Sequence, residues 1–368
     1  MLTSMSLTDR EREIVVLLRR DPLIGSEALA EALGTTRAAV NVHLSNLGKK
    51  GVILGRGYVL SEEPAVVVIG GANMDVKARS TRSAVPATSN PGTGSMAAGG
   101  VGRNIAENLA RLGTRTHLVA AIGSDGLGDQ VLAATSGAGV HVEHVRRSAR
   151  ATGTYTAVLD ADGELVVAVA DMAATDELSP EQVNAARDLV AAASLLVLDG
   201  NLSTATLGFA LDLATAAGVR VLLEPVSVPK AAALAHLVAA DRPLFAITPN
   251  RDELAALTDL PTRTDRQVAR AARALHDRGV ELVWVRLGDR GSLLSSVDDR
   301  VELAAVPAEV ADVTGAGDAM LAAFCHALLT GAEPADAAAY GHAAAALTVA
   351  SPHTVRPDLT DRLVRSLL

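Results

Sequence analysis

Five short apolar runs constrain the fold of this sequence more than any other feature, because each ends in glycine or in polar residues. Alanine-rich, helix-forming segments separate the later ones. The runs are residues 65–69, 195–198, 219–223, 244–247 and 282–285. Strands that are apolar throughout are covered on both faces, as in parallel sheets packed between helices. The pattern therefore predicts an α/β fold with a doubly wound sheet and a site at the carboxyl ends of its strands.

A second group of β segments does not fit the parallel pattern. Residues 154–159 and 165–170 are joined by residues 160–163, a turn that is typical of an antiparallel hairpin. We expect these two strands to form a small β lid beside the main sheet. Residues 81–98 are small and polar and include two prolines, so turns or a mobile flap are expected there.

A glycine-rich turn at residues 312–317 precedes a helical apolar pattern that ends near Gly331. The free amides at a helix N-terminus favour an anion, and Gly315 and Gly317 let a ligand approach the backbone closely. Asp318 follows, although a carboxylate repels a bound anion. Its position suits a base that takes the proton of a hydroxyl attacking phosphorus. The alternative is an ordinary tight turn whose carboxylate is stabilised by the helix dipole.

Two further segments place polar side chains beside predicted strand ends and helix starts. Asn73 and Asp75 follow the run 65–69, and the Asp75 carboxylate suits two sugar hydroxyls. An Asx-type turn is the alternative for this residue. Residues 99–113 begin with glycines and continue with helical apolar spacing. Asn104 then lies in the first helical turn, where its amide can reach a ligand hydroxyl.

The first sixty residues form a separate predicted unit of three short helices and a hairpin. Helix caps are predicted at Thr8, at Ser26 and at Thr35 or Thr36. The spacing of Thr8 and Glu11 is that of a capping box. Residues 49–60 predict two short strands about a glycine-containing turn. The whole unit is similar to a winged helix-turn-helix domain.

That similarity implies DNA contact through the third helix and the wing. The implied residues are Thr36, Arg37, Asn41, His43 and Arg56. Residues 1–60 carry eight basic and six acidic side chains, a net charge of +2, which leaves −11 for the rest of the chain. The split favours DNA at this end. A winged helix used only for protein contacts is the alternative, and we expect a homodimer.

The polar segment 61–64 ends in proline and separates two predicted domains, residues 1–61 and 62–368. A net charge of −9 argues against nucleic acid along the whole chain. The single cysteine, Cys325, excludes an intramolecular disulfide and a cysteine-cluster metal site. No apolar run reaches the ~18 residues of a membrane span, and no signal peptide is evident, so we expect a cytoplasmic protein.

From about residue 65 to residue 358 the sequence resembles the ribokinase (PfkB) family of sugar and nucleoside kinases. Both family signatures are present, Gly-Gly-Val-Gly-Arg-Asn-Ile-Ala at 99–106 and Asp-Val-Thr-Gly-Ala-Gly-Asp-Ala at 312–319. Residues 248–253 match the family's Asn-x-x-Glu element, and residues 287–291 match its nucleotide-binding glycine turn. The pairing of the two signatures in this order is far more specific than either alone.

The resemblance implies a ribokinase-like phosphotransferase that uses ATP, Mg²⁺ and, as in many members, K⁺. Asp318 is the implied base, with an anion hole at Gly315, Ala316 and Gly317. The implied nucleotide-side residues are Asn250, Arg286, Gly288, Gly291 and His342. Glu253 is implied for Mg²⁺, and Asp312 and Thr314 for the monovalent cation. The implied sugar-side residues are Asn73, Asp75, Gly99, Gly100 and Asn104. Glu224 departs from the aspartate or asparagine usual in relatives but keeps a carboxylate.

Several segments look like pseudouridine kinases in particular, namely residues 89–92, 103–113, 170–172 and 198–202. This likeness implies ATP-dependent phosphorylation of the 5′-hydroxyl of pseudouridine. Further substrate-side candidates are Ser89, Asn90, Thr154, Asp171, Asp199 and Asn201. Two alternatives stay open. One is a ribokinase or another nucleoside or sugar kinase, and the other is a ligand-sensing transcriptional regulator built on a kinase fold.

Overall fold

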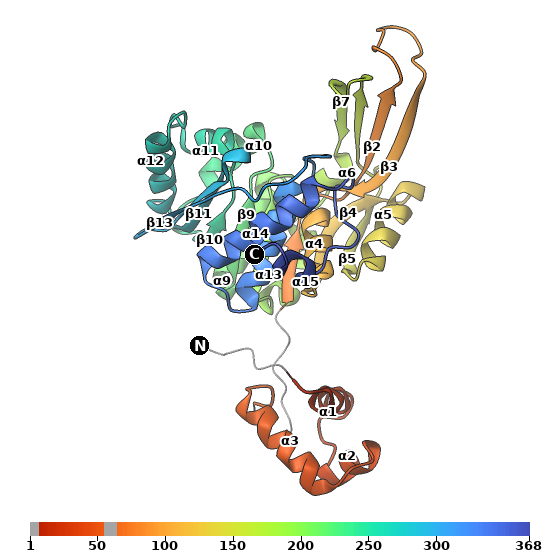
Figure 1. The fold of residues 1–368 in the computed structure, drawn as a ribbon, viewed down its shortest axis with the longest axis vertical. Coiled ribbons are helices and arrows are strands. Elements are labelled where there is room, and N and C mark those ends of the chain that lie inside the picture. The colour runs from red at the N-terminus through yellow and green to blue at the C-terminus, as the bar shows by residue number, and fades with distance from the viewer. Residues whose placement is uncertain (1–6, 55–64) are drawn as a thin grey trace. The chain divides into compact units, whose positions relative to one another are not determined.

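Figure 1 shows the fold in the computed structural model, which describes residues 7–54 and 65–368. The chain divides into two compact units, Met1–Glu63 and Pro64–Leu368. Each unit has a hydrophobic core of its own. None of the described helices combines the length and the apolar character that a membrane span requires.

Three helices build the N-terminal unit: α1 (Asp9–Arg20), α2 (Ser26–Ala32) and α3 (Arg37–Lys49). Their apolar faces meet in a small core that includes Ile14, Leu29 and Leu47. The predicted capping box of α1 is present, because Thr8 and Glu11 each accept a hydrogen bond from the other's backbone amide. Local sequence signals therefore set the start of this helix.

Two expectations for the N-terminal unit need correction. Gly25 is the N-cap of α2, and Ser26 is its first helical residue. Helix α3 runs to Lys49, so the hairpin expected over residues 49–60 cannot begin at that residue. Residues 55–60 of the expected wing, including Arg56, lie outside the described residues.

A nine-stranded mixed sheet forms the centre of the second unit, in the order β13-β12-β11-β10-β9-β8-β1-β4-β5. Its strands are β1 (Ala65–Ile69), β4 (Arg115–Gly123), β5 (His141–Ser148), β8 (Leu195–Asp199), β9 (Arg220–Glu224), β10 (Leu244–Ile247), β11 (Val280–Arg286), β12 (Ser292–Ser295) and β13 (Arg300–Leu303). The strands from β11 to β5 pair in parallel, and β12 and β13 pair antiparallel at one edge. All five predicted apolar runs are confirmed as central strands.

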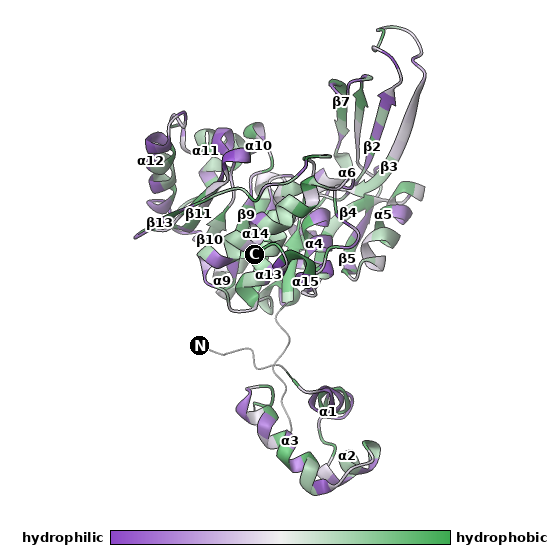
Figure 2. Ribbon diagram, viewed as in Figure 1, coloured by the Kyte–Doolittle hydropathy of each residue, from purple (hydrophilic) through white to green (hydrophobic). Residues whose placement is uncertain are grey.

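Helices cover both faces of this sheet, as a doubly wound fold requires. One core cluster joins one face to α4 (Val101–Arg111), α5 (Gly126–Gly137), α13 (Ala316–Leu329), α14 (Pro334–Val349) and α15 (Asp361–Arg365). The other joins the opposite face to α7 (Pro180–Asn184), α8 (Arg187–Ala191), α9 (Thr204–Ala217), α10 (Val228–Leu234), α11 (Arg251–Thr258) and α12 (Asp265–His276). A short α6 spans Ala173–Asp176. Figure 2 shows hydrophobic colour on the central strands and hydrophilic colour on the outer side of α12.

A second sheet of four strands, in the order β3-β2-β6-β7, forms a lid that projects from the central sheet (Figure 1). Its strands are β2 (Asn73–Ser80), β3 (Gly92–Gly99), β6 (Thr154–Leu159) and β7 (Leu165–Asp171). The predicted antiparallel pair β6–β7 is confirmed. The expectation of turns or a flap over residues 81–98 was wrong beyond residue 91, because β3 pairs with β2 along its whole length. Asn73 and Asp75 accordingly belong to a lid strand and not to a turn after β1.

Candidate active site

Two helices that begin at glycines bring the two signature segments together. Gly100 is the N-cap of α4 with φ 98°, and Gly315 is the N-cap of α13 with φ 81°. A Cβ at Gly100 would lie 2.5 Å from the carbonyl oxygen of Gly71, and one at Gly315 would overlap that of Thr354. Backbone conformation and space therefore both require glycine here. Because α4 packs against α13, side chains from their first turns can meet.

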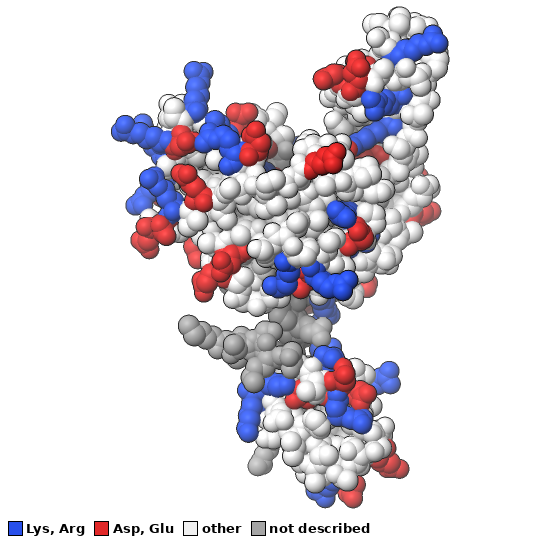
Figure 3. Space-filling model, in the orientation of Figure 1, with Lys and Arg blue, Asp and Glu red and all other residues white. Residues whose placement is uncertain are grey.

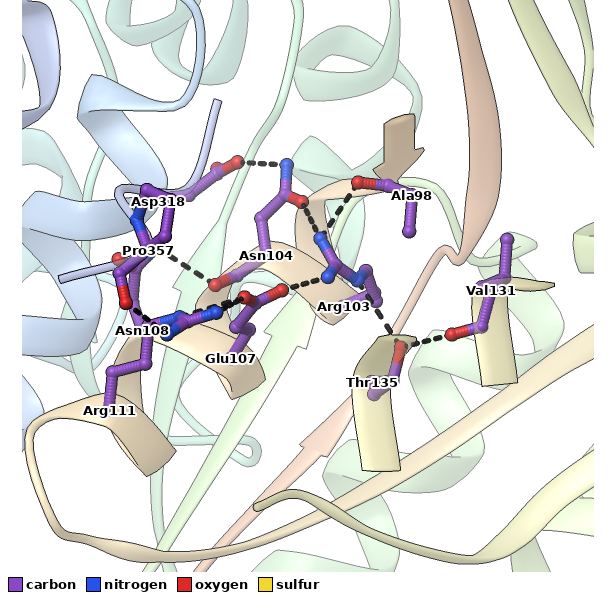
Figure 4. Close-up of polar contacts among 10 residues, drawn as sticks. All are labelled: Ala98, Arg103, Asn104, Glu107, Asn108, Arg111, Val131, Thr135, Asp318 and Pro357. Atoms are coloured by element: carbon purple, nitrogen blue, oxygen red, sulfur yellow. Dashed lines mark hydrogen bonds and ion pairs between the residues drawn. The ribbon is translucent and has the colours of Figure 1, made fainter. Parts of the chain in front are cut away.

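Those side chains are Asn104 and Asp318 (Figure 4). Asn104 Nδ2 donates a hydrogen bond to Asp318 Oδ2 at 2.9 Å, across 214 residues of sequence. Burial, reinforced by the negative charge of Glu224, raises the pKa of Asp318 to about 8, although the Asn104 hydrogen bond opposes the shift. A carboxylate with so high a pKa accepts a proton readily. The arrangement is chemically suited to general-base catalysis.

The orientation of Asn104 is fixed by a buried network behind it. Arg103 Nη1 donates to Asn104 Oδ1 at 3.0 Å and to the Ala98 carbonyl oxygen at 2.8 Å. Glu107 forms ion pairs with both Arg103 and Arg111. Since the guanidinium can only donate, the Asn104 oxygen must face Arg103 and its amide must face Asp318. The pair of Arg103 and Glu107 was not predicted, although two opposite charges four residues apart in a helix were a usable signal.

A second charged cluster surrounds Arg286 at the end of β11. Arg286 Nη2 lies 2.7 Å from Glu224 Oε1 and 3.3 Å from Glu253 Oε2. The Thr248 hydroxyl donates a hydrogen bond to Glu224 at 2.6 Å, and the backbone amide of Asn250 donates one to Glu253 at 2.8 Å. Burial and the neighbouring Glu224 raise the pKa of Glu253. One cation thus serves two buried carboxylates, and Glu224 joins the cluster although the sequence analysis gave it no role.

Arg286 also connects this cluster to the glycine turn. A Cβ added at Gly317 would overlap the Nη1 atom of Arg286, so the guanidinium borders the start of α13. The charges of Glu224 and Arg286 both act on the pKa of Asp318, with Glu224 raising it and Arg286 lowering it. The first turn of helix α13 therefore carries the base candidate and lies beside a fixed positive charge.

The sequence matches the family described as pfkB family carbohydrate kinase over residues 63–361. That span includes both glycine-opened helices, the lid and the Arg286 cluster. The chain belongs to the PfkB family of carbohydrate kinases. A second match, described as winged helix-turn-helix DNA-binding, covers residues 7–53. PfkB kinases are phosphotransferases with alcohol acceptors, which agrees with a base candidate in a glycine turn at a helix N-terminus.

Relatives of this PfkB kinase match it over most of its length. It is 35% identical to "Uncharacterized sugar kinase YeiI" of Escherichia coli (strain K12), with 96% of this chain and 97% of that protein covered. It is 32% identical to "Pseudouridine kinase" of the same organism, with 84% and 98% covered. The structure of Arabidopsis thaliana ribokinase complexed with ribose and ATP superposes with a TM-score of 0.73 at 28% identity, covering 83% and 99%. The fold is therefore ribokinase-like.

In this PfkB kinase the lid strand β2 points three polar side chains toward the glycine turns. Asn73, Asp75 and Lys77 alternate along the strand and so share one face. Asn73 Nδ2 donates to Asp75 Oδ1 at 2.7 Å, and a Cβ at Gly99 would overlap the Asp75 carboxylate. Burial raises the pKa of Asp75. Lys77, which the sequence analysis missed, reaches Asp312 at the start of the second signature.

Asp199 and Asn201 form hydrogen bonds beside the turn between β1 and β2 of the PfkB site. The Asp199 side chain is fully buried and accepts hydrogen bonds from the amides of Gly71 at 2.9 Å and Asn201 at 2.8 Å. Burial raises its pKa. The Asn201 side chain accepts a hydrogen bond from Lys230. The position of Asp199 supports the turn between β1 and β2, and its carboxylate is occupied by backbone amides.

The other substrate-side candidates lie on the lid. Thr154 and Asp171 are directly opposite each other on β6 and β7. Ser89 and Asn90 lie in the connection between β2 and β3, at the far tip of the lid in Figure 1. The Asn90 side chain there bonds both the amide and the carbonyl of Val85. The structure therefore does not bring Ser89 and Asn90 near Asp318.

The remaining nucleotide-side candidates are two glycines of a turn and one core residue. Gly288 and Gly291 have φ 66° and 90° and close a turn in which the Leu287 amide donates to the Gly291 carbonyl at 2.8 Å. His342 is buried, and its Nε2 lies 2.7 Å from Ser292 Oγ. The imidazole thus belongs to a core network, and its nucleotide-side role stays a prediction.

On the third helix, α3, three of the DNA-side candidates are exposed. Thr36 is the N-cap of the helix, and Arg37 and Asn41 follow on its open side. His43 is half-buried, and its Nδ1 atom is buried without a hydrogen-bond partner among the described residues. The structure therefore favours Arg37 and Asn41 over His43 as surface contacts.

Proposed function

We propose that this chain transfers the γ-phosphoryl group of ATP to the 5′-hydroxyl of pseudouridine. The observation that carries the proposal is the pair Asn104–Asp318 at the N-terminus of a glycine-opened helix. Similarity over 98% of the length of a pseudouridine kinase supports the choice of acceptor. A ribokinase with bound ribose and ATP shares the fold, which supports ATP as the donor.

In the proposed reaction, Asp318 accepts the proton of the attacking hydroxyl while the new oxygen–phosphorus bond forms. The backbone at Gly315, Ala316 and Gly317 forms the anion hole, because a helix N-terminus presents amides and positive potential to the transferring group. Arg286 adds a fixed positive charge beside it. Asp75 and Asn73 hold the sugar hydroxyls from the lid.

Mg²⁺ fits the charge of the second cluster. Glu224 and Glu253 share one guanidinium, so the cluster carries surplus negative charge and oxygen donors, which are the ligands that Mg²⁺ prefers. We propose that Glu253 and Asn250 hold the ion with the phosphates of ATP. Bound there, Mg²⁺ supplies charge neutralisation for the phosphoryl group. The nucleotide itself is proposed to lie along the turn of Gly288 and Gly291.

The acceptor can be tested with the purified full chain, Mg²⁺-ATP and a panel of pseudouridine, uridine, ribose, inosine and fructose 6-phosphate. We expect kcat/KM for pseudouridine to exceed that for every other acceptor by at least about tenfold, because a site built for a base's polar edge penalises its absence. Preference for ribose or a purine nucleoside would retain the chemistry and reject the acceptor. Ligand binding without any turnover would favour a non-catalytic sensor.

We further propose that the N-terminal unit binds a DNA operator, with a homodimer as the binding form. The match to a winged helix-turn-helix and the exposed Arg37 and Asn41 support this proposal. On the face in Figure 3, basic and acidic side chains are interspersed over the unit. Because the net charge of +2 is modest, the proposed DNA binding must depend on specific contacts more than on overall charge.

DNA binding can be tested by selecting duplexes from a random library and measuring affinities by fluorescence anisotropy. We expect an enriched, two-fold symmetric site, and Arg37→Ala should weaken it about tenfold or more, since one good base contact contributes about 1–3 kcal/mol. Arg12→Ala, which removes an exposed arginine of α1, is the matched control. No enrichment over random duplexes would leave the unit a protein-contact module.

A further inference from the structure

An ion pair joins the lid to the second signature, and neither the family match nor the proposed reaction assigns it. Lys77 Nζ lies 2.7 Å from Asp312 Oδ2, with 32% and 25% of the two side chains exposed. Lys77 belongs to β2 of the lid, whereas Asp312 is the first residue of the glycine turn, three residues before Gly315. The contact therefore bridges two parts of the kinase unit that are separated by 235 residues in sequence.

Asp312 is itself part of the turn that it introduces. Its Oδ1 atom accepts the Thr314 amide at 2.8 Å, and its own amide donates to the Val349 carbonyl at 3.2 Å. The carboxylate therefore has one oxygen on the lid lysine and the other on the backbone amide that leads into Gly315.

The same geometry bears on a monovalent cation, which the family resemblance places at Asp312 and Thr314. Both oxygens of the Asp312 carboxylate are already engaged, one by an amide and one by an ammonium group. An ammonium ion and K⁺ carry the same charge, and both bind to oxygen atoms. The side-chain donors present thus fit a tethered ammonium better than a free cation.

We propose that Lys77 is a positioning residue that stands in for a monovalent cation and fixes the anion-hole turn to the lid. The proposal rests on the proposed phosphoryl transfer. With Lys77 in place, the amides at Gly315 to Gly317 keep their orientation when the lid lies over the site. Lys77 shares the β2 face with Asp75, and its charge offsets part of the effect of burial, which raises the Asp75 pKa.

The first test compares turnover of the best acceptor by the wild type, Lys77→Met and Lys77→Arg in K⁺ and in choline chloride at equal ionic strength. The wild type should show the same kcat in both salts. Lys77→Met should lose roughly 10- to 100-fold in kcat in choline, as for a misplaced catalytic group, and should regain part of it in K⁺ or NH₄⁺. Lys77→Arg should retain most activity.

Arg79→Met is the matched control, because Arg79 lies two residues further along the same strand and bonds the lid carbonyl of Ala161 instead. Its kcat should stay within about twofold of wild type in both salts. A wild type that requires K⁺, or a Lys77→Met variant that behaves like Arg79→Met, would overturn the proposal.

A second readout does not depend on turnover. Amide hydrogen exchange of peptides covering residues 312–318 should be faster in Lys77→Met than in wild type or Arg79→Met, because the turn loses its anchor. Faster exchange in a chain that phosphorylates no acceptor would retain the anchoring role and reject the proposed kinase activity. Unchanged exchange in an active kinase would reject the anchoring role alone.

Discussion

Asp318→Asn is expected to lower kcat by roughly 10²- to 10⁴-fold, the usual contribution of a positioned general base. Asparagine keeps the shape of the side chain and can still bond Asn104, so the fold should persist. Steady-state kinetics with the best acceptor measure the loss, and circular dichroism checks the fold. Asp298→Asn, in an exposed segment between β12 and β13, is the matched control. Turnover near that of the control would remove Asp318 from its role.

The same variant should report the raised pKa of Asp318 through stability. The folded pKa of about 8 lies above the ordinary value of 3.8, so the folded state favours the protonated carboxyl. Its contribution to stability is complete below about pH 4 and is lost as pH rises toward 8. Asparagine does not ionise. The melting temperature of Asp318→Asn relative to wild type should therefore rise between pH 5 and pH 8.5, and an unchanged difference would contradict the shift.

Arg286→Met should lower the free energy of unfolding by about 3–5 kcal/mol, because two buried carboxylates lose the cation that they share. Urea denaturation measures this cost. Arg242→Met is the control, since Arg242 pairs with Asp212 at the surface, where such a pair contributes about 1 kcal/mol or less. Equal losses for the two variants would show that the cluster around Arg286 is not specially costly to break.

A rescue experiment separates the structural role of Arg286 from its catalytic one. Adding Glu224→Gln and Glu253→Gln to Arg286→Met removes both stranded charges, so most of the lost stability should return. Turnover should not return, because the guanidinium beside Gly317 and the carboxylate proposed for Mg²⁺ are both absent. Recovery of turnover in this triple variant would place Arg286 outside the reaction.

The central sheet was predictable because its strands are continuously apolar, and the glycine turns were predictable because glycine has few substitutes there. Strand β3 was missed because Gly92–Gly99 has small residues with no alternation, and only its partner β2 makes it a strand. Strand β5 was missed because it is a largely polar edge strand. Local sequence patterns do not encode such non-local pairing.

The candidate site shows the same division. Asp318 and Asn104 were predicted singly from helix starts, but their hydrogen bond depends on how α4 and α13 pack. Glu224 and Lys77 find their partners only through the tertiary fold, and no short motif marks them. The sequence predicted which segments matter, while the pairing of charges required the structure.

The glycines at the base of the lid have a consequence for how this protein can evolve. Side chains at Gly70, Gly100 and Gly153 would all collide with neighbouring atoms, which lie within 3 Å of the added carbon. The connection at residues 81–91 is exposed and meets no such restriction. Mutation can therefore reshape the tip of the lid, whereas these glycines at its attachment have few substitutes. A lineage can thus change the tip without disturbing the glycine-opened helix that carries Asn104.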